Sequence, residues 1–197
     1  MDKRLEQQIA FILEADKLKN VLRRNYILDD TRRENSAEHS WHTILMAMIL
    51  FDYADNKDQL NLTKIFKMIT IHDLVEIIAG DTFMFDKDAN EGKFDKEIHA
   101  AKSIFKILPY DQGKELYDLW LEFESEESPD AIFAASVDKL MPVLLNTYST
   151  GISWREADIT SEIILETLSG ITKGPKKLNS LLNDLVKIAK EKQILDK

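Results

Sequence analysis

Hydrophobic residues recur at every third or fourth position along most of the chain, with polar residues between them. This spacing places the hydrophobic side chains on one side of an α-helix, whereas strand-like alternation never lasts longer than a few residues. The pattern predicts about eight helices. They cover residues 4–20, 36–54, 62–79, 94–108, 111–124, 130–148, 154–168 and 176–195. The sequence therefore predicts an all-α fold in which the helices pack as a bundle.

The chain shows no internal repeat and no low-complexity segment that would separate two halves. Its 197 residues are enough for one domain with a hydrophobic core of its own. We therefore expect a single domain over residues 1–197, completed by the helices within residues 154–195. The connection over residues 80–92 is longer than a bundle loop needs to be, and long loops in compact domains are often functional.

Composition and charge exclude several classes of protein. The chain has no cysteine, which rules out a disulfide scaffold, a zinc ribbon, an iron–sulfur site and a thiol nucleophile. A formal net charge of −9 disfavours non-specific binding to nucleic acid or to anionic lipid. No apolar run approaches the roughly 18 residues of a membrane-spanning helix, and no signal peptide is visible. We therefore expect a cytoplasmic protein with neither a membrane nor a nucleic-acid partner.

Three of the predicted helices carry potential metal ligands on the side that faces the core. These ligands are His39 on the second helix, His72 and Asp73 on the third, and Asp138 on the sixth. Burying imidazoles and carboxylates costs several kcal/mol unless they are paired or bind a metal ion, and mixed nitrogen and oxygen donors suit one divalent ion. Pro142 deprives the Asp138 carbonyl of its helical hydrogen bond. The loosened turn is either a simple kink or a means of aiming the Asp138 carboxylate.

The order of these residues resembles the H…HD…D signature of the HD-domain metal-dependent phosphohydrolases. Residues 32–40, RRENSAEHS, are similar to the R-x-E-(N/S)-x-(S/A)-(E/D)-H stretch of the 5′-deoxynucleotidase branch. Residues 72–81, HDLVEIIAGD, are similar to its H-D-x-x-E-x-x-x-G-D block. The similarity covers roughly residues 5–190, and the signature itself lies within residues 32–138.

This resemblance implies an all-helical, often dimeric enzyme. In the family the four signature residues bind one divalent ion, and a metal-bound water attacks a nucleoside 5′-monophosphate. Carried over to this chain, the ligands are His39, His72, Asp73 and Asp138. The donor types admit Mn, Co, Fe or Zn. The implied function is removal of the 5′-phosphate from (deoxy)nucleoside 5′-monophosphates by a homodimer.

The resemblance also implies roles for residues around the ligands. Glu76 and Asp81 correspond to acidic residues that activate or orient the water, and Arg32 corresponds to the arginine of the loop before the first histidine. In this branch a basic residue of the first helix, within a Lys-Arg context, reaches the phosphate. The nearest match here is Lys19, which is followed by asparagine, with Arg23 and Arg24 just beyond. Lys19, Arg23 and Arg32 are therefore the candidates for binding the substrate.

Several interpretations stay open at this point. The protein could be an HD-domain hydrolase of another phosphate ester, or a module that senses a nucleotide without turnover. Phe83 and Phe85 could cover a nucleobase or a dimer partner. We expect His42 either to pack or to support the metal ligands, and His99 to lie at the surface or at an interface. We expect the tryptophans to lie in the core. The residues concerned are His42, His99, Trp41, Trp120 and Trp154.

Overall fold

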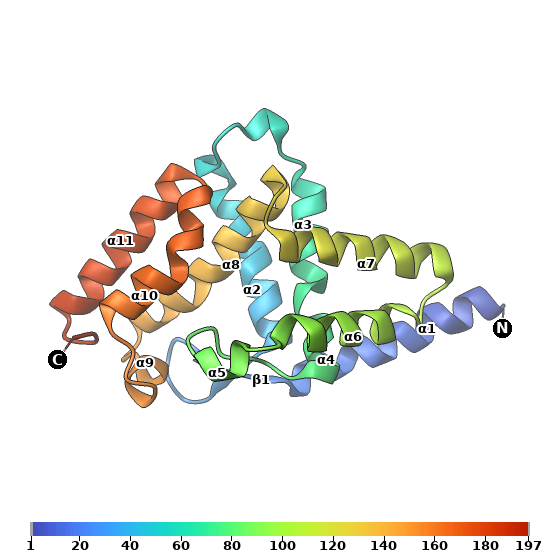
Figure 1. Ribbon diagram of the computed structural model, residues 1–197, viewed down its shortest axis with the longest axis horizontal. Helices are drawn as coiled ribbons and strands as arrows, with labels where there is room; N and C mark the ends of the chain where they lie inside the picture. The colour runs from blue at the N-terminus through green and yellow to red at the C-terminus, as the bar shows by residue number, and fades with distance from the viewer. Residues whose placement is uncertain (1, 197) are drawn as a thin grey trace.

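A computed structural model describes residues 2–196 and confirms the all-α class (Figure 1). Helix α8 is the centre of the bundle, since α2, α3, α7 and α11 all pack against it. The α-helices are α1 (Lys3–Ala15), α2 (Ser36–Leu50), α3 (Leu62–Ile71), α4 (Glu76–Ala79), α5 (Lys87–Asn90), α6 (Lys93–Phe105), α7 (Tyr110–Ser125), α8 (Pro129–Tyr148), α9 (Ile152–Glu156), α10 (Ser161–Thr167) and α11 (Lys176–Glu191). Neighbouring helices cover most of the surface of α8, and hydrophobic residues therefore occur on most sides of this helix.

The prediction of one continuous helix over residues 62–79 is wrong. The α-helix ends at Ile71, a 3-10 turn η4 (His72–Val75) follows, and the short α4 resumes at Glu76. A 3-10 turn is more tightly wound than an α-helix, so it rotates the side chains that follow it. The turn contains His72 and Asp73, and it therefore decides where both candidate ligands point.

Two further predicted helices are also divided. The first becomes α1 followed by a 3-10 turn η1 (Asp16–Asn20), and residues 154–168 contain parts of α9 and α10 with a break between them. Further 3-10 turns join other elements. They are η2 (Phe51–Tyr53), η3 (Lys57–Gln59) and η5 (Leu168–Lys173).

A small antiparallel hairpin connects η1 to α2, and the helical pattern did not reveal it. Strand β1 (Leu22–Tyr26) pairs with β2 (Arg33–Asn35), with Leu22 opposite Asn35 and Tyr26 opposite Arg33. Strands of five and three residues are too short to establish a period-2 pattern. The hairpin ends at Asn35, whose side chain accepts the Glu38 amide hydrogen bond and forms a capping box at the start of α2.

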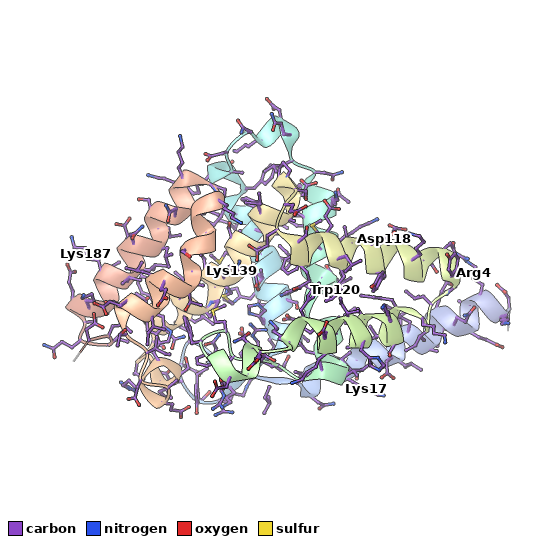
Figure 2. The ribbon with its side chains drawn as sticks, viewed as in Figure 1. Arg4, Lys17, Asp118, Trp120, Lys139 and Lys187 are labelled. Carbon is purple, nitrogen blue, oxygen red and sulfur yellow. The ribbon has the colours of Figure 1, made fainter. Side chains whose placement is uncertain are left out.

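The hydrophobic core is continuous from Leu18 to Leu195. Trp120 and Trp154 lie fully inside it, as expected, and Figure 2 shows Trp120 within the bundle while Lys17 and Lys187 project outward. Trp41 is the exception, because it is 65% exposed on α2. Within residues 2–196, none of the helices has the length and apolar character to cross a membrane.

Candidate active site

The first candidate ligand, His39, lies in the first turn of α2 and is completely buried. The capping box at Asn35 fixes where this helix begins, and therefore fixes the position of the ring. His39 Nε2 lies 2.7 Å from Asp138 Oδ1. Its other nitrogen, Nδ1, faces Glu34 at 3.4 Å. The ring is thus held between two carboxylates.

The second imidazole, His72, comes from the 3-10 turn between α3 and α4. Its Nδ1 donates a hydrogen bond of 2.7 Å to the Ile69 carbonyl, which leaves Nε2 free to bind something else. That Nε2 lies 3.0 Å from Asp73 Oδ1 and 3.2 Å from Asp138 Oδ1. Within residues 2–196, this Nε2 is buried and has no hydrogen-bond partner. The geometry leaves this nitrogen directed at the two carboxylates.

Three of the four predicted ligands therefore converge, and the fourth lies beside them. His39, His72 and Asp138 each offer a ligand atom, and these atoms lie within 4.8 Å of one another. Asp73 joins them through its contact with His72. Two imidazoles and two carboxylates with an orphaned buried nitrogen are a donor set that fits one divalent ion.

Charge in this cluster is balanced by protons when no cation is bound. Burial lowers the pKa of His72, but the charges of Asp73 and Asp138 outweigh burial and raise that pKa to about 10. Burial raises the pKa of Asp138, yet His72 and His39 hold it well below its usual range. The cluster is therefore a set of ion pairs in which a divalent cation would compete with the imidazole protons.

A second group of charges adjoins the cluster and centres on Arg23 of β1. Its Nη1 lies 3.0 Å from Asp73 Oδ2 and 3.7 Å from the nearest oxygens of Glu76 and Asp81. Burial lowers the pKa of Arg23, but the three carboxylates raise it above its ordinary value. Ser36 donates a hydrogen bond of 2.6 Å to Glu76 Oε2 and so fixes this side chain. The hairpin thus delivers one guanidinium to the edge of the candidate metal site.

Glu76 holds its proton more tightly than an ordinary glutamate. Burial and the charge of Asp73 raise its pKa to about 8, while Arg23 opposes the increase. Glu76 is also a helical turn beyond Asp73, on the same side of the chain. Its carboxylate can therefore exchange a proton near neutral pH beside the ligand cluster.

One cavity joins both groups of charges. Its wall includes His72, Asp73 and Asp138, and also Arg23, Glu76 and Asp81. The connection over residues 82–85 forms another part of the wall, where the rings of Phe83 and Phe85 meet with centroids 5.3 Å apart. The long loop is thus part of the candidate site.

Sequence reasoning missed three charged residues that α6 and α7 contribute to this cavity: Lys93, Glu97 and Glu124. Lys93 lies 3.5 Å from Glu97, which is buried. Burial, then the charge of Glu97, raises the pKa of Glu124 to about 7. A lysine and a glutamate four residues apart usually form a solvated helix pair. Only the packing of α6 against η4 and α7 shows that this pair faces the cavity.

Two of the predicted substrate-binding residues lie elsewhere. Lys19 is 66% exposed and forms an ion pair with Asp16. Arg32 is 53% exposed and forms two hydrogen bonds of 2.8 Å with Glu38. Neither residue lines the cavity. Of the three candidates, the structure brings only Arg23 to the ligand cluster.

The remaining histidines lie apart from the cluster. The ring of His42 stacks on Trp41 at the surface of α2, with centroids 5.7 Å apart. His99 is exposed on α6. Both placements agree with the packing and surface roles expected from the sequence.

The family is decided by a sequence profile described as "HD domain", which matches residues 15–178. The chain belongs to the HD-domain family. The 5′-deoxynucleotidase HDDC2 of Homo sapiens is 32% identical over 137 residues, which are 69% of this chain and 65% of that protein. HDDC2 of Dictyostelium discoideum is 28% identical over 144 residues, covering 71% of this chain and 76% of that protein. The match thus spans just under two thirds of the human relative.

Solved structures share the fold of this HD-domain chain. A predicted metal-dependent phosphohydrolase from Magnetospirillum magnetotacticum MS-1 is 40% identical, with a TM-score of 0.91, and the match covers 98% of this chain and 99% of that one. The PH0347 protein from Pyrococcus horikoshii OT3 has a TM-score of 0.68 at 24% identity, over 91% of this chain and 99% of that one. The similarity to PH0347 shows a shared fold and nothing more.

The raised pKa of His72 predicts that metal affinity increases with pH. His72 Nε2 must lose its proton before it can bind an ion, so binding releases at least one proton at neutral pH. We expect the Kd for Mn²⁺ to fall about tenfold per pH unit between about pH 6 and pH 8. Titration calorimetry in two buffers of different ionisation enthalpy measures both the affinity and the proton release. A Kd that is constant over this range would contradict the assignment.

Proposed function

We propose that this HD-domain protein is a metal-dependent phosphohydrolase that removes the 5′-phosphate from (deoxy)nucleoside 5′-monophosphates. The observation that carries the proposal is one cavity that is lined both by three of the four candidate ligands and by the nearly buried Arg23. Phosphoryl transfer needs these two elements next to each other, a cation site for the phosphoryl oxygens and a positive side chain for the developing charge. The names of the curated relatives, 5′-deoxynucleotidases, support this choice of substrate.

We assign one divalent ion, either Mn, Co, Fe or Zn, to His39, His72, Asp73 and Asp138. When bound, such an ion polarises phosphoryl oxygens and lowers the pKa of a coordinated water towards about 7. The protein's part is to hold the ligands in a dry, fixed arrangement. All four come from buried or nearly buried positions on helices or on the turn between them.

Arg23 is the residue that we assign to the phosphate. Its guanidinium is always charged, and its planar fork can donate two parallel hydrogen bonds to a phosphoryl group. It lies beside Asp73, one of the proposed ligands, so a phosphate that reaches the metal site also reaches Arg23. The neighbouring carboxylates keep the side chain in place before substrate arrives.

Glu76 is the group that we assign to the proton of the attacking water, and Asp81 can share this task. Both carboxylates lie 3.7 Å from Arg23 and line the cavity. A general base works best when its pKa is close to the working pH, and the pKa of Glu76 is raised to about 8. The hydrogen bond from Ser36 orients the carboxylate.

Two other functions remain as alternatives, namely hydrolysis of a different phosphate ester and nucleotide sensing without turnover. Turnover is favoured because three of the four ligands, the arginine and both acids line one cavity. Phosphate release from a panel of nucleotides with Mn²⁺ or Co²⁺ decides between these functions. The prediction of a cytoplasmic protein and of a single domain over residues 1–197 stays a prediction.

Replacing Glu76 by Ala should leave the metal bound and slow the chemistry. A general base contributes about 10²–10⁴-fold, so we expect kcat to fall by that factor with a much smaller change in substrate affinity. Metal content and phosphate release are measured on the same preparation. Loss of metal in proportion to activity would make Glu76 a ligand, and unchanged kcat would direct the search for the base to Asp81.

Replacing Arg23 by Lys should weaken phosphate binding more than metal binding. The variant keeps the charge and loses the planar fork, so we expect roughly a tenfold or greater rise in KM for the nucleotide and in Ki for inorganic phosphate. The matched controls are Arg32→Lys and Lys19→Arg, which change exposed cations outside the cavity. Equal effects of all three substitutions would contradict a special role for Arg23.

We further propose that the protein forms a homodimer. Helices α1 and α2 each expose a stripe of large hydrophobic side chains at helical spacing. The residues are Leu5, Ile9, Ile12 and Leu13 on α1, and Trp41, Leu45, Met48 and Ile49 on α2. Scattered exposed hydrophobic residues are normal, but stripes of this kind mark interaction surfaces.

Light scattering at micromolar concentration should give a mass twice that of one chain. Charging the α2 stripe by Trp41→Glu together with Ile49→Lys should yield a monomer, because a desolvated apolar interface cannot accept unpaired charges. Leu165→Lys, at a hydrophobic residue of α10 that is also exposed, is the control that should remain dimeric. A wild-type protein that is monomeric would contradict the proposal.

A further inference from the structure

Glu34 is a buried carboxylate to which the proposed chemistry gives no role. It is the central residue of β2 and is only 3% exposed. A buried carboxylate destabilises a fold by several kcal/mol unless a partner compensates it. Glu34 therefore needs a positively charged or hydrogen-bonding partner, and the identity of that partner indicates the role of Glu34.

That partner is His39. Glu34 Oε2 lies 3.4 Å from His39 Nδ1, within ion-pair distance, and among residues 2–196 both of these buried atoms lack a hydrogen-bond partner. The opposite nitrogen of the same ring, Nε2, is the one that faces Asp138. Glu34 thus approaches the ring from behind, on the side away from the other ligands.

Each imidazole of the cluster has an oxygen atom facing its Nδ1. His72 donates its Nδ1 hydrogen to the Ile69 carbonyl, which leaves Nε2 for the cluster. His39 has Glu34 at the equivalent nitrogen. A histidine that binds a metal through Nε2 must carry its proton on Nδ1, and an acceptor there fixes both the tautomer and the ring orientation.

We propose that Glu34 is a positioning residue that holds His39 in the orientation and tautomer needed to bind the metal ion. This inference rests on the proposed function, because it takes His39 as a ligand. Glu34 accepts the Nδ1 hydrogen, and its negative charge makes Nε2 a stronger donor than a carbonyl partner would. The carboxylate acts through His39 and does not touch the substrate.

The hairpin explains why Glu34 is held so firmly. Its neighbours in β2 are both engaged, since Arg33 pairs with Tyr26 of β1 and Asn35 caps α2. Successive side chains of a strand point to opposite sides, so the fixed neighbours force Glu34 inward. The same hairpin directs Arg23 into the cavity from the other strand. One hairpin therefore supports both the metal site and the phosphate site.

Metal affinity of Glu34 variants tests the inference directly. The variants are Glu34→Ala, which removes the acceptor, and Glu34→Gln, which keeps an acceptor oxygen and loses the charge. Loss of such a partner weakens metal binding by about 10–100-fold. We expect that loss for the alanine variant, and a smaller loss for the glutamine variant, in calorimetric titrations with Mn²⁺. A Kd for the alanine variant within about twofold of wild type would overturn the proposal.

Controls separate this role from a purely structural one. Glu156→Gln changes an exposed glutamate that contacts Tyr26 and Arg33 of the same hairpin, so it should leave the Mn²⁺ affinity unchanged. The visible spectrum of bound Co²⁺ should shift in Glu34→Gln and stay unchanged in Glu156→Gln. If the alanine variant does not fold, the glutamine variant decides, and wild-type affinity and spectrum in that variant would overturn the proposal.

The result also distinguishes this inference from the proposed function. Wild-type protein that binds neither Mn²⁺ nor Co²⁺ would overturn the metal site, and the role of Glu34 with it. Wild-type protein that binds metal and hydrolyses nucleotides, together with unaffected Glu34 variants, would overturn only the role of Glu34.

Discussion

The structure depends on the burial of two imidazoles and two carboxylates at one point of a helical core. Burying such a set of charges destabilises the fold unless other interactions offset the cost. Each charge loses its hydration energy, and only nearby ion pairs and hydrogen bonds replace that energy. Here Asp138 on the central helix α8 contacts both His39 and His72. These two contacts join α2, η4 and α8 to one another. The elements around this cluster supply the remaining partners.

These partners form successive layers of compensating charge. Asp73 faces His72 with one oxygen and Arg23 with the other, which links the ligand cluster to the phosphate side of the cavity. Arg23 in turn approaches Glu76 and Asp81. The acids that we assign to proton transfer are therefore kept close to the reacting position by the same cation that we assign to the substrate. Such preorganisation is what an electrostatic catalyst requires.

The sequence was sufficient to predict most of the helices and the convergence of His39, His72 and Asp138, because both depend on periodic burial. Hydrophobic spacing identifies a helix, and a charged residue on a buried stripe stands out against it. The sequence could not show that the helix breaks at His72, since the break leaves the apolar spacing nearly unchanged. It also could not reveal a hairpin as short as β1 and β2.

The local sequence pattern does not predict which charged residues line the cavity. Lys19 and Arg32 looked like binding residues but form exposed ion pairs with neighbours in the chain. Glu34, Lys93 and Glu97 received no role from the sequence, yet Glu34 and Glu97 are buried, and Lys93 and Glu97 line the cavity. Nothing in a short sequence window distinguishes these cases, because the direction of a charged side chain is set by distant elements that pack against it.

The central claim is that a divalent ion binds at the point where α2, η4 and α8 meet. Anomalous diffraction from crystals grown with Mn²⁺ tests it most directly. The account predicts one strong anomalous peak in direct contact with Nε2 of His39 and His72 and with the carboxylates of Asp73 and Asp138. A peak elsewhere, for example between Glu97 and Glu124, with the four residues still paired to one another, would contradict it.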